Sequence, residues 1–340
     1  MIYNRFFPYK ILKYSNKLEA IANNQIPYPV VLHIYLTNTC NNDCDFCIMQ
    51  NEKKKVGTLG KDILIKVLQD AHKIGVKLVH FSGGGEPTLN KNLLNSVMMA
   101  NKLNMETALS TNGSKYIPTL MKYLNYLRIS VNAGTNKKYS EIMKPKDKHT
   151  FTDIKNISKQ YLNDRKKFKT PKLCDIGWAF VLTDKNYKDI YKFCKEANDV
   201  GVDFVHIRPA FLKDDIILKT LIIPTFKRIE KAKKEFKKLK IYNISNKFNG
   251  YWTSRTYDKC RSTPLIAVLS ATGEFIVCQD VFIRFGNIYK QTFKDIWGSK
   301  EHKKAMKKIC LKQCPRCVEN NINEIIQHCF INNDVRMNLI

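Results

Sequence analysis

Several features are missing from this sequence of 340 residues, and each absence excludes a class of protein. The chain has no apolar run of about eighteen residues or more, which excludes a typical transmembrane helix. Its first residues, Met1-Ile-Tyr-Asn-Arg-Phe-Phe-Pro, lack the charged, apolar and small-residue segments of a signal peptide. We therefore expect a cytoplasmic protein whose eleven cysteines are thiols or metal ligands rather than disulfides.

Acidic residues and arginine are also scarce. The chain has 30 Asp and Glu against 58 Lys and Arg, a formal net charge of +28, and only ten of the basic residues are Arg. Arg is preferred for bidentate contacts with phosphates and bases, so an excess of dispersed Lys is a weak sign of nucleic-acid binding. We interpret the charge mainly as solvated, Lys-rich helix faces. Docking of an acidic partner is a second interpretation, and RNA binding is a third.

What the sequence does contain is three closely spaced cysteines, Cys40, Cys44 and Cys47, in a polar loop directly after the apolar run 30–36. Three thiolates are one short of a closed structural site, and the open position can bind a substrate or cofactor. The competing interpretation is a zinc knuckle or three buried thiols. Zinc sites usually combine two Cys-X2-Cys pairs, and no such pair follows within about a hundred residues. The spacing therefore favours a 4Fe–4S cluster with one open iron.

Apolar periodicity predicts six alternations of strand and helix between about residues 30 and 212. Such alternation implies a parallel sheet with right-handed crossovers. The predicted strands are 30–36, 77–81, 106–110, 126–131, 173–182 and 204–207, with helices near 63–71, 93–103, 118–124, 136–162 and 186–200. Each strand ends in polar or glycine-bearing sequence. Because sites form at the carboxyl ends of parallel strands, we expect these ends to converge on one site.

The cysteine spacing, with Phe46 before the last cysteine, resembles that of the radical S-adenosylmethionine (AdoMet) superfamily. The run Gly84-Gly85-Glu86-Pro87 after the second strand is similar to the glycine-glycine-glutamate motif of that family. The resemblance implies that Gly84, Gly85 and Glu86 hold the AdoMet amino group. Glycines let the backbone approach a ligand closely, and an ammonium group favours carboxylate and carbonyl oxygens.

The same resemblance implies further AdoMet contacts at the ends of later strands. Ser130 and Asn132 would contact the ribose or carboxylate, and Arg208 the carboxylate or adenine. Ser110 and Asn112 lie on the adjacent strand end. The competing interpretation of Ser110, Asn112 and Arg208 is a turn residue or a surface ion pair. The run that begins at Gly177 matches the fifth-strand motif of the family poorly.

Four later cysteines, Cys260, Cys278, Cys314 and Cys317, surround a predicted hairpin at 266–278 and a helix near 292–297. The pattern resembles the SPASM module, or its shorter Twitch form, which binds an auxiliary 4Fe–4S cluster. The next cysteine, Cys329, comes too late for the longer form, which favours one auxiliary cluster. A structural zinc site is the competing interpretation. We interpret Cys310 as incidental or a spare ligand, and expect Cys174 and Cys194 to be core thiols.

The resemblance implies an α/β fold, a partial (β/α)6 barrel with a small carboxyl-terminal α+β auxiliary cluster domain. We expect a helical extension (1–25), the barrel (26–215), a helical linker (216–250) and the SPASM/Twitch-like domain (251–332). The implied activity is reductive cleavage of AdoMet at the first 4Fe–4S cluster, with electrons from an acidic donor such as flavodoxin or ferredoxin.

The 5′-deoxyadenosyl radical would then abstract hydrogen from a small polar substrate, for which we favour a carbohydrate-type dehydrogenation, epimerisation or dehydration. Only about thirty residues precede the first strand, which we take to disfavour a leader-peptide-binding domain. The alternatives are modification of a peptide, protein or tRNA by the same chemistry, and a non-catalytic iron–sulfur or zinc protein associated with nucleic acid.

Overall fold

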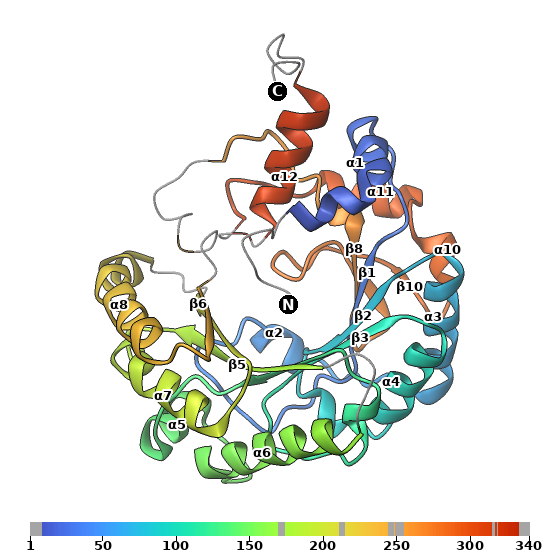
Figure 1. Cartoon of the computed structure of the whole chain (residues 1–340). Coiled ribbons are helices and arrows are strands. Elements are labelled where there is room, and N and C mark those ends of the chain that lie inside the picture. The colour runs from blue at the N-terminus through green and yellow to red at the C-terminus, as the bar shows by residue number, and fades with distance from the viewer. Residues whose placement is uncertain are drawn as a thin grey trace.

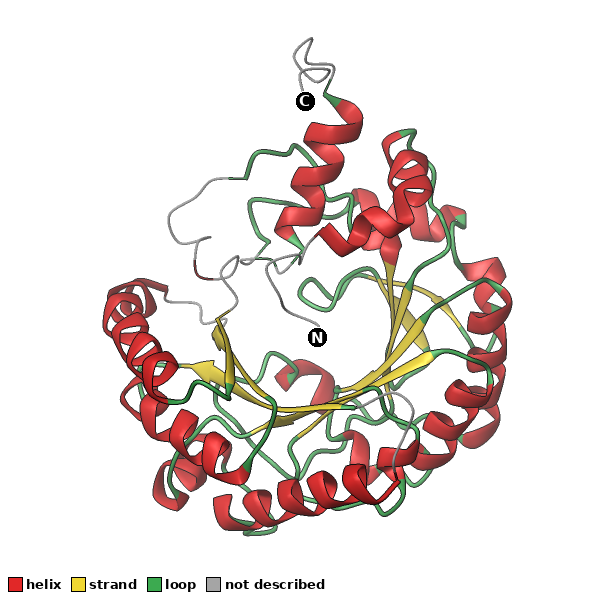
Figure 2. Cartoon of the chain, in the orientation of Figure 1, coloured by secondary structure: helices red, strands yellow, loops and turns green. Residues whose placement is uncertain are grey.

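The computed structural model describes residues 9–168, 174–210, 215–243, 248, 255–314, 317 and 319–332. A curved sheet surrounds the centre of the molecule, and helices cover its outer face (Figures 1 and 2). Among the described residues, no helix is both long and apolar enough to cross a membrane.

The sheet has ten strands in the order β10-β9-β8-β1-β2-β3-β4-β5-β6-β7. Strands β1 to β7 follow chain order and are parallel, and β8 is parallel to β1 on its other side. Strands β8, β9 and β10 form an antiparallel meander. The bounds are β1 Val31–Tyr35, β2 Leu78–Ser82, β3 Glu106–Thr111, β4 Tyr126–Ser130, β5 Asp175–Leu182, β6 Phe204–Pro209, β7 Lys240–Asn243, β8 Ile266–Leu269, β9 Glu274–Ile276 and β10 Arg284–Asn287.

Helices connect the strands and flank the sheet at both ends of the chain. The α-helices are α1 Ser15–Ala22, α2 Gln50–Lys53, α3 Lys61–Lys73, α4 Leu93–Lys102, α5 Asn136–Met143, α6 Phe151–Phe168, α7 Ile190–Val200, α8 Asp215–Glu235, α10 Phe293–Ile296, α11 Lys300–Lys307 and α12 Asn320–Ile326. Short 3-10 segments are η1 Tyr9–Tyr14, η2 Pro87–Leu89, η3 Leu120–Lys122, η4 Tyr187–Asp189 and η5 Thr263–Leu265, and a π-helical turn, η6, covers Gln327–Ile331.

The core lies between the sheet and its helices. In α3 the buried residues Leu64, Val67, Leu68 and Ala71 repeat at helical spacing and so form one apolar face. Strands β1 and β2 alternate buried and half-buried residues. Because side chains alternate between the two faces of a strand, one face packs on the helices and the other faces the barrel lumen.

The six predicted alternations of strand and helix are confirmed, with two differences. The predicted helix 118–124 is only the 3-10 turn Leu120–Lys122, since Thr119 before it has a left-handed backbone (φ 64°) that a continuing α-helix does not tolerate. The segment predicted as a helical linker also contains a strand, β7, parallel to β6. The predicted start of strand five, Leu173, lies outside the described residues.

The predicted hairpin after Cys260 is confirmed as the antiparallel pair β8 and β9. Strand β8 also pairs with β1, where Val268 lies opposite His33. The main sheet therefore continues across the predicted boundary between barrel and auxiliary domain. This pairing brings the carboxyl-terminal cysteines to the strand that precedes the first three.

Candidate active site

The loop that follows β1 carries Cys40, Cys44 and Cys47, hereafter the loop cysteines. Contacts with two distant segments fix its path: Asp43 N donates to Lys144 O (3.1 Å), and Asp45 pairs with Lys144 and Lys185 (2.5 and 3.0 Å). The Cys44 thiol is buried and lies 3.5 Å from Met143 O. The end of α5 and the segment that follows β5 therefore hold the cysteine loop in place.

The glycine-rich loop after β2 lies directly against the start of the cysteine loop. Gly85 N donates to Thr37 O (2.7 Å), and Glu86 N donates to Thr39 O (2.8 Å). A Cβ atom on Gly85 would lie 1.9 Å from Thr39 O, and one on Gly84 would lie 2.1 Å from Asn38 Oδ1. The contact at Gly85 is with backbone, so glycine is required there for the two loops to meet, whereas a side chain at Gly84 would require Asn38 to move.

Glu86 anchors this loop to the end of β3. Its Oε1 accepts hydrogen bonds from Thr88 N (3.0 Å), Thr88 Oγ1 (2.7 Å) and Thr111 Oγ1 (2.5 Å). Its Oε2 accepts one from Asn112 N (2.6 Å). Burial raises the pKa of Glu86, and these four donors oppose that increase. The carboxylate thus positions two strand ends, and Oε2 retains capacity for a further donor.

One cavity of about 580 Å³, hereafter the central cavity, unites the predicted site. It is lined by the loop cysteines and by all the predicted AdoMet-binding residues, Gly84, Gly85, Glu86, Ser110, Asn112, Ser130, Asn132 and Arg208. These residues come from the ends of β1, β2, β3, β4 and β6 and from the loops that follow them. Their convergence follows from the parallel topology, which places all the carboxyl ends at one edge.

Two of these residues also hold neighbouring loops together. The Asn112 amide donates to Asn41 Oδ1 (2.7 Å), beside Cys40. Asn132 has a left-handed backbone (φ 62°), and its Oδ1 accepts from Val181 N (2.7 Å). Their contribution to ligand binding stays a prediction. Their hydrogen bonds show that each side-chain amide also links two neighbouring loops.

The thiols of the loop cysteines suit an iron–sulfur cluster better than a single ion. All three line the same cavity, but within the described parts of the chain no three Cys, His, Asp or Glu side chains converge on a single metal position. A cubane binds each thiolate to a different iron and so accepts a wider spacing. Burial raises the pKa of Cys40 and Cys44, to about 12 for Cys44, so thiolate formation there depends on a bound cation.

A second, smaller cavity of about 50 Å³ is lined by all four predicted auxiliary ligands. These residues, hereafter the auxiliary cysteines, are Cys260, Cys278, Cys314 and Cys317. Burial raises the pKa of Cys278, Cys314 and Cys317, and neighbouring thiols of the same set raise it further. None of the chain's eleven cysteines forms a disulfide, and Cys174 and Cys194 are buried core thiols, as predicted.

Backbone N–H groups point at sulfur in both sites. Asn42 N lies 3.5 Å from Cys40 Sγ, Asp280 N lies 3.4 Å from Cys278 Sγ, and Glu319 N lies 3.2 Å from Cys317 Sγ. In each case the donor is two residues after the cysteine. Such N–H···S contacts stabilise thiolates and tune the reduction potential of a cluster.

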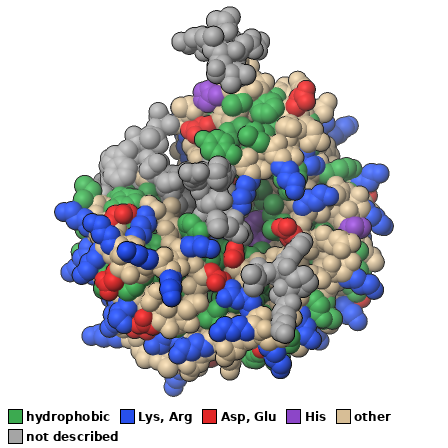
Figure 3. All heavy atoms as spheres, in the orientation of Figure 1, with side chains coloured by type: hydrophobic (Ala, Val, Ile, Leu, Met, Phe, Trp, Pro, Cys, Tyr) green, Lys and Arg blue, Asp and Glu red, His purple; other side chains and the backbone are tan. Residues whose placement is uncertain are grey.

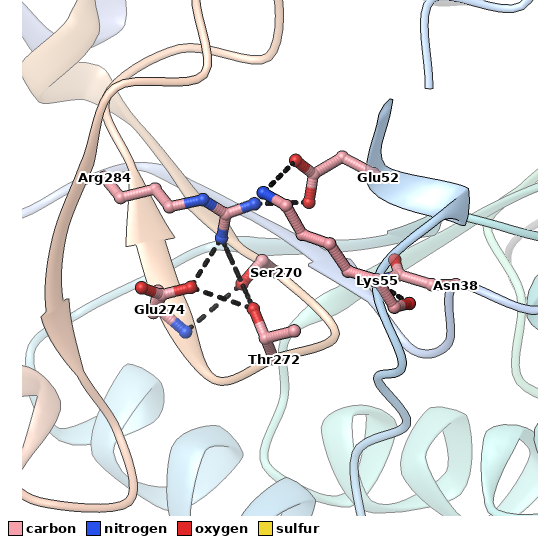
Figure 4. Close-up of polar contacts among 7 residues, drawn as sticks. All are labelled: Asn38, Glu52, Lys55, Ser270, Thr272, Glu274 and Arg284. Atoms are coloured by element: carbon pink, nitrogen blue, oxygen red, sulfur yellow. Dashed lines mark hydrogen bonds and ion pairs between the residues drawn. The ribbon is translucent and has the colours of Figure 1, made fainter. Parts of the chain in front are cut away.

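An ion-pair network joins the two sites (Figure 4). Arg284 on β10 pairs with Glu52 on α2, directly after the loop cysteines, and with Glu274 on β9 at 2.7 Å. Lys55 also pairs with Glu52 at 3.0 Å. Burial of Glu52 acts to raise its pKa, but the hydrogen bonds from Arg284 and Lys55 outweigh burial and lower it. The network therefore holds β9 and β10 against α2, the helix that follows the loop cysteines.

Four further polar residues of the barrel lumen were not predicted from the sequence. His33, His80, Arg128 and His206, hereafter the lumen cluster, also line the central cavity. Each is followed two positions later by another polar residue that lines it: Tyr35, Ser82, Ser130 and Arg208. Polar residues at alternate positions of otherwise apolar strands were the signal available, because such positions share one face.

Comparisons with known proteins agree with this geometry. The profile of the radical SAM superfamily matches residues 34–170, and that of SPASM, described as an iron-sulfur cluster-binding domain, matches residues 260–318. A Pyrococcus furiosus protein named "tungsten-containing aldehyde ferredoxin oxidoreductase cofactor-modifying protein" is 23% identical over 308 residues, which cover 80% of this chain and 81% of that protein. A probable GTP 3′,8-cyclase of Saccharolobus solfataricus is 26% identical over 181 residues, 52% of this chain and 55% of the cyclase.

Solved structures share the fold. Streptococcus suis SuiB bound to S-adenosylmethionine aligns with a TM-score of 0.68 at 16% identity, over 96% of this chain and 81% of SuiB. The AdoMet-bound enzyme anSMEcpe aligns with a TM-score of 0.61 at 17% identity, over 82% of this chain and 83% of that one.

The two matched profiles contain the loop cysteines and the auxiliary cysteines respectively. They confirm the predicted cofactors: a 4Fe–4S cluster with AdoMet in the barrel and auxiliary iron–sulfur binding in the carboxyl-terminal domain, in preference to structural zinc. The chain belongs to the radical SAM superfamily of enzymes and carries a SPASM iron–sulfur cluster-binding domain.

Proposed function

We propose that this enzyme abstracts a hydrogen atom from a small polar, carbohydrate-type substrate bound in the central cavity. The observation that carries the proposal is that one cavity runs from the loop cysteines through the lumen to Asp280 and Glu319, beside the auxiliary cysteines. The cofactors supply reductive cleavage of AdoMet to methionine and a 5′-deoxyadenosyl radical. The protein binds and orients the reactants and keeps solvent from them.

The roles of the site residues follow from their contacts. Cys40, Cys44 and Cys47 would hold the cluster and leave one iron for AdoMet. The backbone of Gly84 and Gly85, with Glu86 Oε2, would accept hydrogen bonds from the AdoMet amino group. Ser110, Asn112, Ser130, Asn132 and Arg208 would contact the rest of AdoMet or the substrate.

The names of the sequence relatives support a small substrate, since one modifies a cofactor and the others are GTP cyclases. A peptide substrate is the second candidate, because SuiB was solved with its precursor peptide and anSMEcpe with a peptide. We give the small molecule precedence because the sequence relatives are more similar to this chain than the structural neighbours are.

Transfer of deuterium separates the two candidates. Extract of the source organism grown in deuterated water would be divided by dialysis and incubated with reduced holoenzyme and AdoMet. Deuterium in 5′-deoxyadenosine from the dialysable fraction supports the small substrate. If deuterium transfer requires the fraction retained by dialysis and is abolished by protease, the substrate is a peptide or protein instead. If it requires that fraction and is abolished by nuclease, the substrate is tRNA.

We also propose an acidic electron donor such as flavodoxin or ferredoxin. Its support is the net charge of +28, with Lys and Arg side chains spread over the visible face (Figure 3). Reduction by flavodoxin should slow as salt increases, because salt screens surface attraction. A rate independent of salt would contradict electrostatic docking.

A further inference from the structure

The lumen cluster combines residues of four parallel strands that line the central cavity. His33 on β1 lies opposite His80 on β2 in register, and their rings are 4.7 Å apart. Arg128 on β4 approaches His206 on β6, with Nη1 3.5 Å from Nδ1. His80 Nε2 lies 2.8 Å from Ser110 Oγ on the strand between β2 and β4.

Among the residues that the structure describes, no carboxylate forms an ion pair with Arg128. Its Nε is buried and makes no hydrogen bond among the described residues. The acidic side chains that line the central cavity within the described chain are Glu86, Asp280 and Glu319. Glu86 accepts hydrogen bonds from four donors at the ends of β2 and β3, and none of the three carboxylates is ion-paired with Arg128 in the described parts of the structure.

The imidazoles of His33 and His80 neither add a positive charge to that of Arg128 nor neutralise it. Burial, followed by the Arg128 guanidinium, lowers the pKa of His33 to about 4. Burial, His33 and Arg128 lower the pKa of His80. Both rings are therefore neutral at neutral pH and offer N–H donors beside a permanent cation. The Nδ1 atom of His33 is buried and has no partner among the described residues.

Arg128 is half-buried, and its buried Nε has no hydrogen-bond partner among the described residues. A guanidinium that is partly withdrawn from water and has no carboxylate partner there is costly. An oxyanion in the cavity would provide the missing partner, since the planar guanidinium donates two parallel hydrogen bonds to a carboxylate or phosphate. Neutral imidazole N–H groups and the Ser110 hydroxyl would satisfy its remaining oxygens.

We propose that the lumen cluster binds an anionic group of the substrate, a phosphate ester or a carboxylate, with Arg128 as its principal contact. This inference rests on the proposed function and specifies the class of its substrate. His33 precedes the end of β1 by two residues, about 7 Å at the usual rise of a strand. The anion would therefore lie deeper in the lumen than the loop cysteines, which leaves the rest of the substrate directed toward AdoMet.

Anion binding to the anaerobic holoenzyme with AdoMet tests the proposal without knowledge of the substrate. Inorganic phosphate and malonate are titrated separately by calorimetry in low-chloride buffer. We expect one saturable site for at least one of them. Phosphate alone would identify a phosphate ester, and malonate alone a carboxylate. Absence of saturation for both at about 10 mM, where even a millimolar Kd is detected, would overturn the proposal.

Variants assign the site to Arg128. Arg128→Gln should weaken anion binding about 10- to 100-fold, the range for loss of a charge-assisted hydrogen bond. Arg228→Gln is the matched control, since Arg228 on α8 packs on the Tyr187 ring, donates to Pro224 O of its own helix and does not line the cavity. Equal affinity in wild type and Arg128→Gln would overturn the proposal. If Arg128→Gln does not retain its iron, Arg128→Lys is used instead. This variant keeps the positive charge but lacks the paired guanidinium donors, so it should show a smaller loss of affinity.

Formation of 5′-deoxyadenosine in the same preparation separates this inference from the proposed function. Anion binding without AdoMet cleavage would support the anion site and contradict the proposed radical activity. Cleavage of AdoMet without anion binding would support the radical activity and contradict the anion site.

Discussion

Replacement of Glu86 by glutamine tests the loop after β2 in a buried site whose contacts are known. Two of the four donors to the carboxylate are the backbone N–H groups of Thr88 and Asn112, which approach different oxygens. The other two are hydroxyls, which can rotate to accept instead. A glutamine amide has only one oxygen, so in either orientation its NH2 group faces a backbone N–H.

A buried N–H left without an acceptor costs about 1–3 kcal/mol, which should appear as a lower free energy of unfolding of the holoenzyme. If Glu86 accepts a hydrogen bond from the AdoMet ammonium as proposed, loss of its carboxylate should weaken AdoMet binding about 10- to 100-fold. Equilibrium dialysis with labelled AdoMet and denaturant unfolding measure the two effects. Glu230→Gln removes an exposed carboxylate on α8 and should change neither quantity appreciably. Unchanged AdoMet affinity and stability in Glu86→Gln would refute the assigned role.

Three further changes test other parts of the site. Gly85→Ala should abolish AdoMet binding measured by dialysis, because the new Cβ would lie 1.9 Å from a backbone oxygen, whereas Gly60→Ala, with no atom within 4 Å, should be tolerated. Arg284→Met leaves the buried Glu52 carboxylate without its main partner and should destabilise the holoenzyme by up to about 3–5 kcal/mol in denaturant unfolding, with Arg228→Met as the control. Because the pKa of Glu52 is lowered in the folded protein, ionised Glu52 stabilises the fold fully above its ordinary pKa of 4.5, and this stabilisation is lost as the pH falls below that value. Arg284→Met should therefore lose this part of the pH dependence of unfolding. A dependence of unfolding free energy on pH identical to that of wild type would contradict the network. Replacement of all four auxiliary cysteines by Ala should remove about half of the iron and leave some 5′-deoxyadenosine formation, and full iron retention would exclude them as ligands.

Short sequence patterns predicted those strands and loops whose structure is determined by residues close together in the sequence. Apolar runs gave the parallel strands, and short cysteine and glycine spacings gave the loops, because these features require particular residues at particular positions. The hairpin at Cys278 was found for the same reason. The roles predicted for individual AdoMet-binding residues stay predictions, but all of them line the central cavity.

Features that depend on distant pairing were not predictable in this way. The pairing of β8 with β1 joins segments more than two hundred residues apart, and nothing local in Ile266–Leu269 specifies its neighbour. Strand β7 is only four residues long, too short to show a pattern. The lumen cluster comes from four separate strands, so its members become neighbours only when these strands assemble into the curved sheet.

The central claim is that the loop cysteines hold a cluster that cleaves AdoMet, and the formation of 5′-deoxyadenosine measures it most directly. Anaerobically reconstituted enzyme with dithionite and AdoMet should produce 5′-deoxyadenosine, and Cys44→Ala should produce none, since two thiolates do not hold the cluster. Cys194→Ala is the matched control, because Cys194 is also buried but lies in the core on α7. Wild type with a full cluster and no 5′-deoxyadenosine, or undiminished production by Cys44→Ala, would contradict the account.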